Sequence, residues 1–122
     1  MSKFTIAIHG GAGTILKNML TPELEKQYLD GLQNALDAGY AVLSSNGTAL
    51  DAVEAAVVSL EDNELFNAGK GAVYTKKGLN EMDACIMDGS NLATGAVAGV
   101  RNIKNPVKLA KEIMLHSGHV LL

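Results

Sequence analysis

A glycine-rich segment that directly follows a short apolar run is the strongest constraint on how this chain folds. Residues 4–8 read Phe-Thr-Ile-Ala-Ile, which predicts a buried strand, and residues 9–13 read His-Gly-Gly-Ala-Gly. Glycine adopts backbone angles that are closed to other residues and leaves no Cβ in the path of an approaching backbone or substrate. A simple turn needs one or two such residues. Three at one strand end therefore predict that another segment or a substrate comes very close there.

The composition excludes several classes of function. With 122 residues, of which 48% are hydrophobic and 19% charged, the chain has the make-up of one globular domain or part of one. The net charge of −3 and the 4% aromatic content disfavour a nucleic-acid partner, which selects basic surfaces and stacking rings. The apolar stretches are too short to span a membrane. Because Cys85 has no second cysteine to pair with and no signal-peptide pattern is found, we expect a cytoplasmic protein.

Two helices are predicted in the first half of the chain. Residues 21–23 read Thr-Pro-Glu, which offers an N-cap hydroxyl, a proline at the first helical position and an early acid. Apolar residues then recur at helical spacing to about residue 45, and the Asn-Gly pair at 46–47 is typical of a helix end. Residues 48–51 have the form of a capping box and predict the start of the second helix.

The second half of the chain changes to strand-like patterns. Three strands are predicted there, at residues 71–75, 81–88 and 92–100, with a polar hairpin loop at 76–80 and a turn at 88–91. Residues 105–116 predict a last helix, and the apolar residues 119–122 read as a strand start that a longer chain or a partner would complete. Because the helices are grouped and the strands follow one another, the order predicts an α+β fold with antiparallel pairing.

The glycine-rich segment is open to three functional interpretations. The dinucleotide spacing G-x-G-x-x-G is absent and no predicted helix begins close behind, which disfavours a phosphate-binding loop. The segment is also similar to the oxyanion element of α/β-hydrolases, but the chain has no G-x-S-x-G elbow. The third interpretation is a backbone wall beside a reacting peptide or a nucleophile. A tight structural crossover is the alternative without a function.

A second glycine-containing loop, residues 65–71, follows the acidic end of the second predicted helix. Its Asn67 lies between apolar residues and glycines, and an amide that both donates and accepts suits a group that orients a reactant. The alternative is that Asn67 caps its own loop. Carbonyl groups at such an irregular helix end also suit a hard cation such as sodium.

Two other sets of residues are weaker candidates. His116 and His119 lie three residues apart, but a glycine between them breaks the helix that would align them, and no third ligand is evident. We therefore expect no metal site there. Asp83 is flanked by Met82 and Ala84, a pattern that predicts an inward-facing acid in need of a partner.

Five ordered motifs resemble those of a known family. They read Ile-His-Gly-Gly-Ala-Gly at 8–13, Gly-x-Ala-x-Asp-Ala-Val-x-x-Ala-Val at 47–57, Phe-Asn-Ala-Gly-x-Gly at 66–71, Met-Asp-Ala-Cys-Ile-Met-Asp-Gly at 82–89 and Gly-Ala-Val-Ala-Gly-Val at 95–100. In this order they resemble the plant-type L-asparaginase/isoaspartyl aminopeptidase family of N-terminal nucleophile hydrolases. The resemblance covers essentially the whole chain.

The resemblance implies a four-layer αββα sandwich, of which residues 1–122 supply the N-terminal part of a single domain. It implies a precursor that cleaves itself before a threonine, giving an N-terminal α subunit and a C-terminal β subunit that assemble as a dimer of αβ units. That threonine would attack the side-chain amide of L-asparagine or an isoaspartyl bond in a dipeptide, with its own α-amine as base. This chain is similar to the α subunit and stops short of that subunit's usual end, so the nucleophile lies in the missing β subunit.

The family's site residues carry over to two loops of this sequence and a metal site. Asn67 matches the residue that contacts the nucleophile, and Gly10 and Gly11 match the glycine-rich loop beside the cleavage site. Thr94 opens a run similar to the nucleophile motif, but no cleavable residue precedes it. The resemblance implies no organic cofactor, and a structural sodium ion whose ligands are the main-chain carbonyls of Leu60, Glu61, Asn63, Phe66, Ala68 and Lys70. The Lys70 ammonium must then point outward.

Other functions stay open at this point. A glycosylasparaginase-like enzyme or a threonine endopeptidase would share the sandwich, and the missing half would hold the substrate pocket that distinguishes them. A non-catalytic fragment or binding module is the alternative outside the enzymes. The preference among asparagine, isoaspartyl peptides and glycosylated asparagine is not encoded in these residues.

Overall fold

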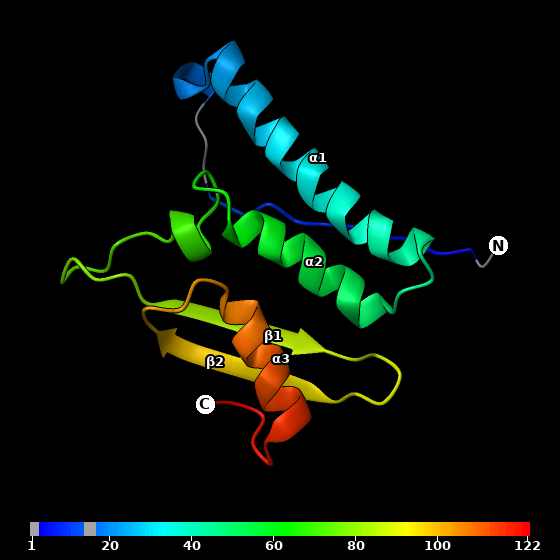
Figure 1. The fold of residues 1–122 in the computed structure, drawn as a ribbon. Helices are drawn as coiled ribbons and strands as arrows, with labels where there is room; N and C mark the ends of the chain where they lie inside the picture. Colours follow the sequence, from blue (N-terminus) through cyan, green and yellow to red (C-terminus); the bar gives the residue numbers. More distant parts are fainter. Residues whose placement is uncertain (1–2, 14–16) are drawn as a thin grey trace.

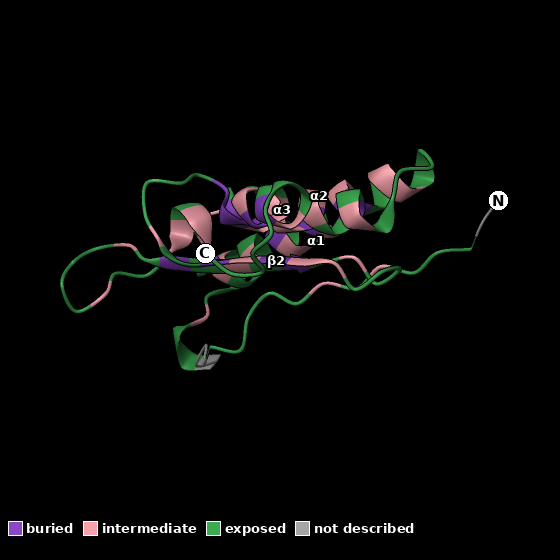
Figure 2. Cartoon of the chain, turned by 90° about the horizontal axis from the view of Figure 1, so that it is seen from below, coloured by how far each residue is buried: buried purple, intermediate pink, exposed green. Residues whose placement is uncertain are grey.

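A computed structural model of the chain describes residues 3–13 and 17–122. Figure 1 shows two long helices beside a two-stranded sheet, and a third helix lying across that sheet. Figure 2 shows the sheet edge-on, with α2 and α3 on one side of it. The predicted combination of grouped helices and consecutive strands is confirmed. The elements in chain order are η1 (Lys17–Met19), α1 (Pro22–Ser44), α2 (Ala49–Glu61), η2 (Gly69–Gly71), β1 (Met82–Met87), β2 (Thr94–Val100) and α3 (Pro106–His116).

α1 begins and ends where the local sequence predicts. The Thr21 hydroxyl accepts a hydrogen bond from the Leu24 N–H at 3.1 Å, which satisfies one donor of the first turn. At the other end Asn46 has φ 61°, and the Gly47 N–H donates to the Val42 carbonyl at 2.8 Å. This is the left-handed helix end that an Asn-Gly pair favours.

α2 starts with the predicted capping box. The Thr48 hydroxyl accepts from the Asp51 N–H at 3.1 Å and donates to the Asp51 carboxylate at 2.7 Å. The helix ends at Glu61, as expected from the acidic run that follows.

α1 packs against α2 through small residues. Gly31, Ala35 and Gly39 recur at every fourth position and are all buried. A Cβ on Gly39 would lie 2.9 Å from the Ala52 carbonyl oxygen, so a glycine is needed for this close approach. Within the described ranges neither α1 nor another helix is both long and apolar enough to cross a membrane.

α3 and the two strands form the hydrophobic core. β1 and β2 pair antiparallel, with a bulge between Met82 and Ala84. A Cβ on Gly95 would overlap the Ala110 carbonyl, so α3 rests directly on β2 at this point. The two longer predicted strands, the turn between them and the last helix are confirmed. The buried side chains of the core are Ile86, Val97, Val107, Ala110 and Ile113.

Residues 4–8 do not form the predicted strand. They run extended beside α1, where Phe4 packs edge-on against Tyr40 with ring centroids 5.3 Å apart. Further along, Ile6 contacts Gly39 at a point where a Cβ would collide with its side chain. A strand needs a partner edge for its N–H and C=O groups, and a helix surface does not supply one. The prediction of a buried strand is wrong, because residues 4–8 form no strand and are exposed or half-buried.

The strand predicted at residues 71–75 is also wrong. The segment begins inside η2, and an isolated bridge between Tyr74 and Asn80 is the strand-like pairing described for it. The Val73 N–H, which a strand would use in its ladder, donates instead to Asn67 Oδ1 at 3.0 Å. A side chain has therefore taken the place of a strand partner. The predicted hairpin loop that follows is confirmed.

Residues 120–122 lie parallel to β2 and extend the sheet edge. The Ala96 N–H donates to the Val120 carbonyl at 2.7 Å, and the Leu122 N–H donates back to the Ala96 carbonyl at 3.2 Å. The strand-like character predicted for this segment is confirmed.

Candidate functional site

A cavity of about 270 Å³ lies where the end of α2, the loop after it and the start of β1 meet. Asn67 and Gly69 line it from the loop, Asp83 from β1 and Pro106 from the start of α3. We call it the Asn67 cavity. A larger hollow of about 700 Å³ lies between residues 3–5 and α1, but it contains none of the predicted site residues. Concave sites with a few converging polar groups are the usual places for ligands, and the Asn67 cavity fits that description.

Asn67 is held by its own loop and keeps one polar group available. Its Oδ1 accepts from the Val73 N–H at 3.0 Å, so the amide caps the loop as one sequence interpretation expected. The side chain is exposed, and its Nδ2 has no hydrogen-bond partner among the described residues. The same amide is thus fixed at one end and free to donate at the other, which is the arrangement that an orienting group needs.

The glycine-rich segment lies against the Asn67 loop. A Cβ on Gly10 would be 3.2 Å from the Phe66 ring and 2.6 Å from the Leu32 side chain. Phe66 is buried and packs edge-on against Tyr28, with ring centroids 5.8 Å apart. Gly11 has φ 121°, a conformation that favours glycine. The fold therefore brings together two segments that the sequence singled out separately.

The loop after α2 curls so that carbonyl oxygens lie next to glycine α-carbons. Gly69 has φ 52°, and a Cβ there would overlap the Glu61 carbonyl oxygen. A Cβ on Gly71 would overlap the Phe66 carbonyl and lie 2.6 Å from the Glu64 carbonyl. Only glycines leave room for these carbonyl oxygens, and carbonyl oxygen is a ligand that a hard cation prefers.

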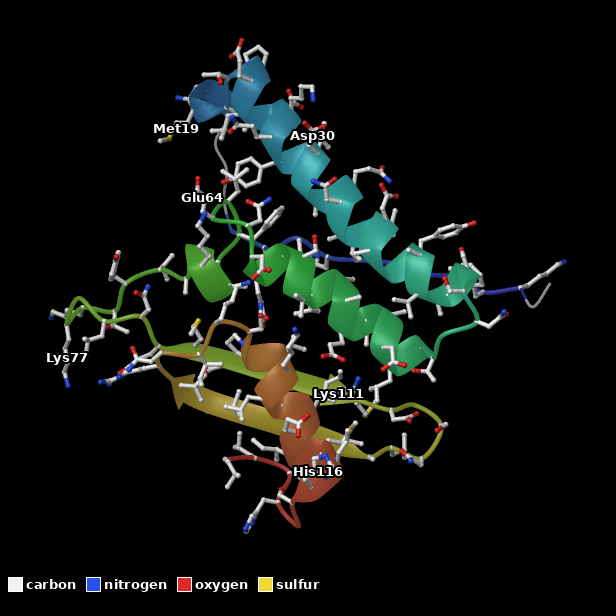
Figure 3. The ribbon with its side chains drawn as sticks, in the orientation of Figure 1. Met19, Asp30, Glu64, Lys77, Lys111 and His116 are labelled. Atoms are coloured by element: carbon white, nitrogen blue, oxygen red, sulfur yellow. The ribbon has the colours of Figure 1, made fainter. Side chains whose placement is uncertain are left out.

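The side chains around this loop are compatible with carbonyl ligation. The Lys70 ammonium pairs with Glu64 at 3.1 Å on the surface, so it points outward as the resemblance requires. Figure 3 shows Glu64 on the loop that follows α2. No group of three or more His, Cys, Asp or Glu side chains in the described part of the chain could hold a metal ion. A cation at this place would therefore be bound by backbone oxygens, not by charged side chains.

Glu61 makes a contact that the sequence did not predict. This last residue of α2 is only 3% exposed, and its Oε1 accepts from the Val107 N–H in the first turn of α3 at 2.9 Å. Its Oε2 is buried and has no hydrogen-bond partner among the described residues. Burial raises the pKa of the Glu61 carboxyl above its ordinary value, although the Val107 N–H acts in the opposite direction.

Asp62 makes a similar but exposed connection to α3. Its carboxylate accepts from the Asn105 amide at 3.1 Å and from the Lys104 ammonium at 3.1 Å. These two hydrogen bonds lower the pKa of the Asp62 carboxyl. No local signal identifies either residue as a contact of α3, because their partners lie more than forty residues further along the chain.

Asp83 and the two histidines are placed differently from each other. Asp83 does have a partner, since its Oδ1 accepts from the Gly99 N–H at 2.8 Å across the bulge, but it is exposed and not inward-facing. His116 and His119 are both exposed, and His116 lies 3.4 Å from Glu112 instead of sharing a ligand with His119.

The chain matches known proteins over almost its full length. A family model described as asparaginase matches residues 2–122. The isoaspartyl peptidase/L-asparaginase of Xenopus laevis is 52% identical over 98% of this chain and 37% of its own length. The isoaspartyl peptidase of Salmonella typhimurium is 48% identical over 100% of this chain and 39% of its own length. The plant-type L-asparaginase of Thermococcus kodakarensis is 50% identical over 96% of this chain and 37% of its own length. The chain thus spans little more than a third of these curated relatives.

Proposed function

This chain belongs to the asparaginase family, and on that premise we propose that it is the N-terminal part of an amidohydrolase. The enzyme would hydrolyse L-asparagine to L-aspartate and ammonia, and would cleave isoaspartyl dipeptides. The proposal is supported by relatives named for both activities. The observation that carries it is the contact of Gly10 with Phe66, which brings the glycine-rich segment against the loop that holds Asn67.

The reacting threonine is proposed to lie outside this chain, at the N-terminus of a β subunit released by self-cleavage. Its hydroxyl attacks the side-chain carbonyl carbon of the substrate, and its own α-amine takes the hydroxyl proton. Ammonia or the amino-acid leaving group departs with a proton, and water then hydrolyses the acyl-enzyme to release aspartate. The length of the relatives, of which this chain covers little more than a third, supports a further segment that holds these groups.

Asn67 is proposed to contact that threonine, and the backbone at Gly10 and Gly11 to form a wall beside the cleavage point. The free Nδ2 of Asn67 and the Val73 hydrogen bond that fixes its Oδ1 support this role. A donor held in place before the reaction lowers the barrier more than one that must first be ordered. Gly10 leaves no side chain between the glycine-rich segment and the Phe66 ring.

The missing half is proposed to complete a four-layer sandwich and to pair as a dimer of αβ units. The sheet face away from α2 and α3 supports a second sheet, because it exposes Cys85 and Met87, the latter 56% exposed. An exposed apolar sheet face is unusual for a complete domain. The other strand edges of the sandwich would come from the same missing segment.

A structural sodium ion is proposed in the loop after α2. The resemblance assigns its ligands to the carbonyls of Leu60, Glu61, Asn63, Phe66, Ala68 and Lys70. The positions of the Glu61 and Phe66 carbonyls, packed against Gly69 and Gly71, support it. Replacing sodium by choline chloride at equal ionic strength is expected to lower the thermal midpoint of the full-length protein, with sodium restoring it. Identical midpoints in the two salts would contradict a bound sodium.

The proposed function is tested on the full-length protein that contains this chain. Intact mass should reveal a second polypeptide that starts with threonine. β-Aspartyl dipeptide, L-asparagine and a glycosylated asparagine are then assayed side by side, and we expect the first two to be hydrolysed. Hydrolysis of the glycosylated substrate alone would indicate a glycosylasparaginase-like enzyme. Cleavage of none of the three would reject the proposed activity.

A further inference from the structure

The carboxylate of Glu61 takes the place of an N-cap for α3. The first N–H groups of a helix have no partner within the helix, and a carboxylate there is also favoured by the helix dipole. Asn105, the residue at the N-cap position, makes no side-chain capping bond. The Val107 N–H donates instead to Glu61 Oε1 at 2.9 Å. The Glu61 side chain therefore links the first turn of α3 to the end of α2.

The backbone of the same residue carries the Asn67 loop. A Cβ on Gly69 would overlap the Glu61 carbonyl oxygen and lie 2.7 Å from the Glu61 Cβ. Gly69 therefore rests directly on Glu61, two residues after Asn67. Asn67 in turn is fixed to Val73 at the far side of the loop.

Glu61 also lines the Asn67 cavity together with Gly69, Asn67 and Pro106. A shift of Glu61 would thus move part of the lining of the cavity and the loop that carries Asn67. Because Glu61 is 3% exposed, water cannot readily take over the hydrogen bond to Val107 if the carboxylate is removed.

We propose that Glu61 is a positioning residue for Asn67: its carboxylate caps α3, and this contact fixes the backbone on which the Asn67 loop lies. The inference rests on the proposed function for its effect on turnover. It assigns no contact between Glu61 and the substrate. It concerns the side chain of Glu61, whereas the proposed sodium site uses only main-chain carbonyls.

The neighbouring Asp62 supplies a matched control. It also contacts residues just before α3, through an exposed hydrogen bond from Lys104 and a part-buried one from Asn105, and its own side chain is exposed. The three atoms nearest to the Cβ position of Gly69 all belong to Glu61, and none of those nearest to Gly71 belongs to Asp62. If any connection between α2 and α3 were enough, Asp62→Ala and Glu61→Ala would have similar effects.

The test compares variants of the full-length protein, with kcat expressed per self-cleaved molecule as counted by intact mass. Glu61→Ala is expected to lower kcat for β-aspartyl dipeptide by about tenfold or more with KM changed by less than about threefold, the result of a misplaced orienting group. Glu61→Gln keeps an acceptor for the Val107 N–H and is expected to retain kcat within about twofold. Asp62→Ala is expected to behave like the unchanged protein.

A purely structural role predicts a different pattern. Ile113→Ala opens the core between α3 and the sheet, so it lowers the thermal midpoint without touching the Asn67 loop. We expect it to leave kcat per folded molecule unchanged. Full kcat in Glu61→Ala, or a loss in Ile113→Ala as large as in Glu61→Ala, would overturn the proposal. So would a loss in Glu61→Gln equal to that in Glu61→Ala.

A second measurement does not depend on activity. The Val73 amide is protected by Asn67 Oδ1, so its hydrogen-exchange rate reports whether the loop is in place. We expect faster exchange at Val73 in Glu61→Ala, and an unchanged rate in Glu61→Gln and Asp62→Ala. If Glu61→Ala does not fold, Glu61→Asp replaces it, because aspartate shortens the side chain by one methylene. We expect Glu61→Asp to exchange faster at Val73 as well. If the exchange rate at Val73 is the same in Glu61→Ala as in the protein without substitutions, the positioning role is rejected. If the protein without substitutions is itself inactive, only the proposed function is rejected.

Discussion

Both ends of α2 are joined to α3 by carboxylates, but only one end borders the Asn67 cavity. At the N-terminal end the Lys111 ammonium lies 2.8 Å from Asp51 and 2.5 Å from Glu54. Figure 3 shows the Lys111 side chain reaching from α3 toward α2. At the C-terminal end Glu61 accepts from the Val107 N–H. The Asp51 side chain is 49% exposed and those of Lys111 and Glu54 are 17% and 19% exposed, whereas Glu61 is 3% exposed.

The difference in exposure separates two kinds of contact. Water and salt compensate when an exposed ion pair is broken, so such pairs contribute little to stability. A buried N–H that loses its acceptor keeps the cost of leaving water. This argument applies only to the Lys111–Asp51 pair, because Lys111 and Glu54 are mostly buried. What separates the two ends is that Glu61 lines the Asn67 cavity, whereas Asp51, Glu54 and Lys111 do not.

Among substitutions near the C-terminal end of α2, Gly69→Ala should have the largest effect on stability and turnover. Backbone strain at its φ of 52° costs about 1 kcal/mol or more, and overlap with the Glu61 carbonyl adds about 1–3 kcal/mol. We expect a lower free energy of unfolding and a lower kcat. Gly78→Ala is the control, because Gly78 has φ 73° but no atom within 4 Å of its Cβ position in the described structure. Equal losses of stability in the two variants, measured by denaturant unfolding, would mean that the Glu61 contact is unimportant.

Asn67→Ala is expected to lower kcat by about ten- to a hundredfold, because it removes a positioned amide. Asn91→Ala is a matched control: its Oδ1 also accepts from a backbone N–H of its own loop, that of Ala93 at 2.8 Å, but in the turn between β1 and β2. Steady-state kinetics on β-aspartyl dipeptide separate the two. Full activity in Asn67→Ala would remove Asn67 from the site.

Lys111→Met breaks the contact at the other end of α2 and should have a small effect. The apolar part of the side chain is kept, but the Glu54 carboxylate, 19% exposed, loses its partner, so we expect the thermal midpoint to fall by a few degrees. Turnover should stay the same, because this end of α2 does not line the Asn67 cavity. A loss of kcat similar to that of Glu61→Ala would show that the two ends of α2 are equivalent after all.

The smallest effect is the pH dependence of the Lys111 contact. Hydrogen bonding to Lys111 lowers the pKa of Asp51 below its ordinary 3.8, and the Asp51 and Glu54 carboxylates raise the pKa of Lys111 above 10.5. The contribution of Asp51 to the free energy of unfolding is therefore present above pH 3.8, and it is lost as the pH falls through the lowered pKa. The contribution of Lys111 to the free energy of unfolding is present below pH 10.5, and it is lost as the pH rises through the raised pKa.

The matching measurement is the difference in thermal midpoint between the unchanged protein and Lys111→Met across pH. We expect this difference in thermal midpoint to be constant between pH 3.8 and pH 10.5. It should become smaller as the pH passes the lowered pKa of Asp51 in acid or the raised pKa of Lys111 in base. A difference that does not change in acid would show that Asp51 carries no charge-dependent part of the contact.

The ends of the helices could be predicted because they depend on neighbouring residues. The Thr21 cap, the Asn46-Gly47 end and the turn closed by Asp88 and Ala93 each need only atoms within a few positions in the chain. The two mistaken strands, at 4–8 and 71–75, needed partners from elsewhere. An extended apolar run is compatible with a sheet or with a helix surface, and local sequence does not distinguish the two.

The candidate site divides in the same way. The sequence by itself determined that Gly10, Gly11 and Asn67 belong to special loops, because glycine clusters and an amide between them have few other uses. Only the tertiary structure decided that the two loops meet at Phe66, and that Glu61 joins them to α3. Val107, which donates its N–H to Glu61, lies 46 residues further along the chain. This contact exists only once α2 and α3 have packed together. Burial then makes that contact costly to break, and burial is a property of the whole fold and not of any local pattern.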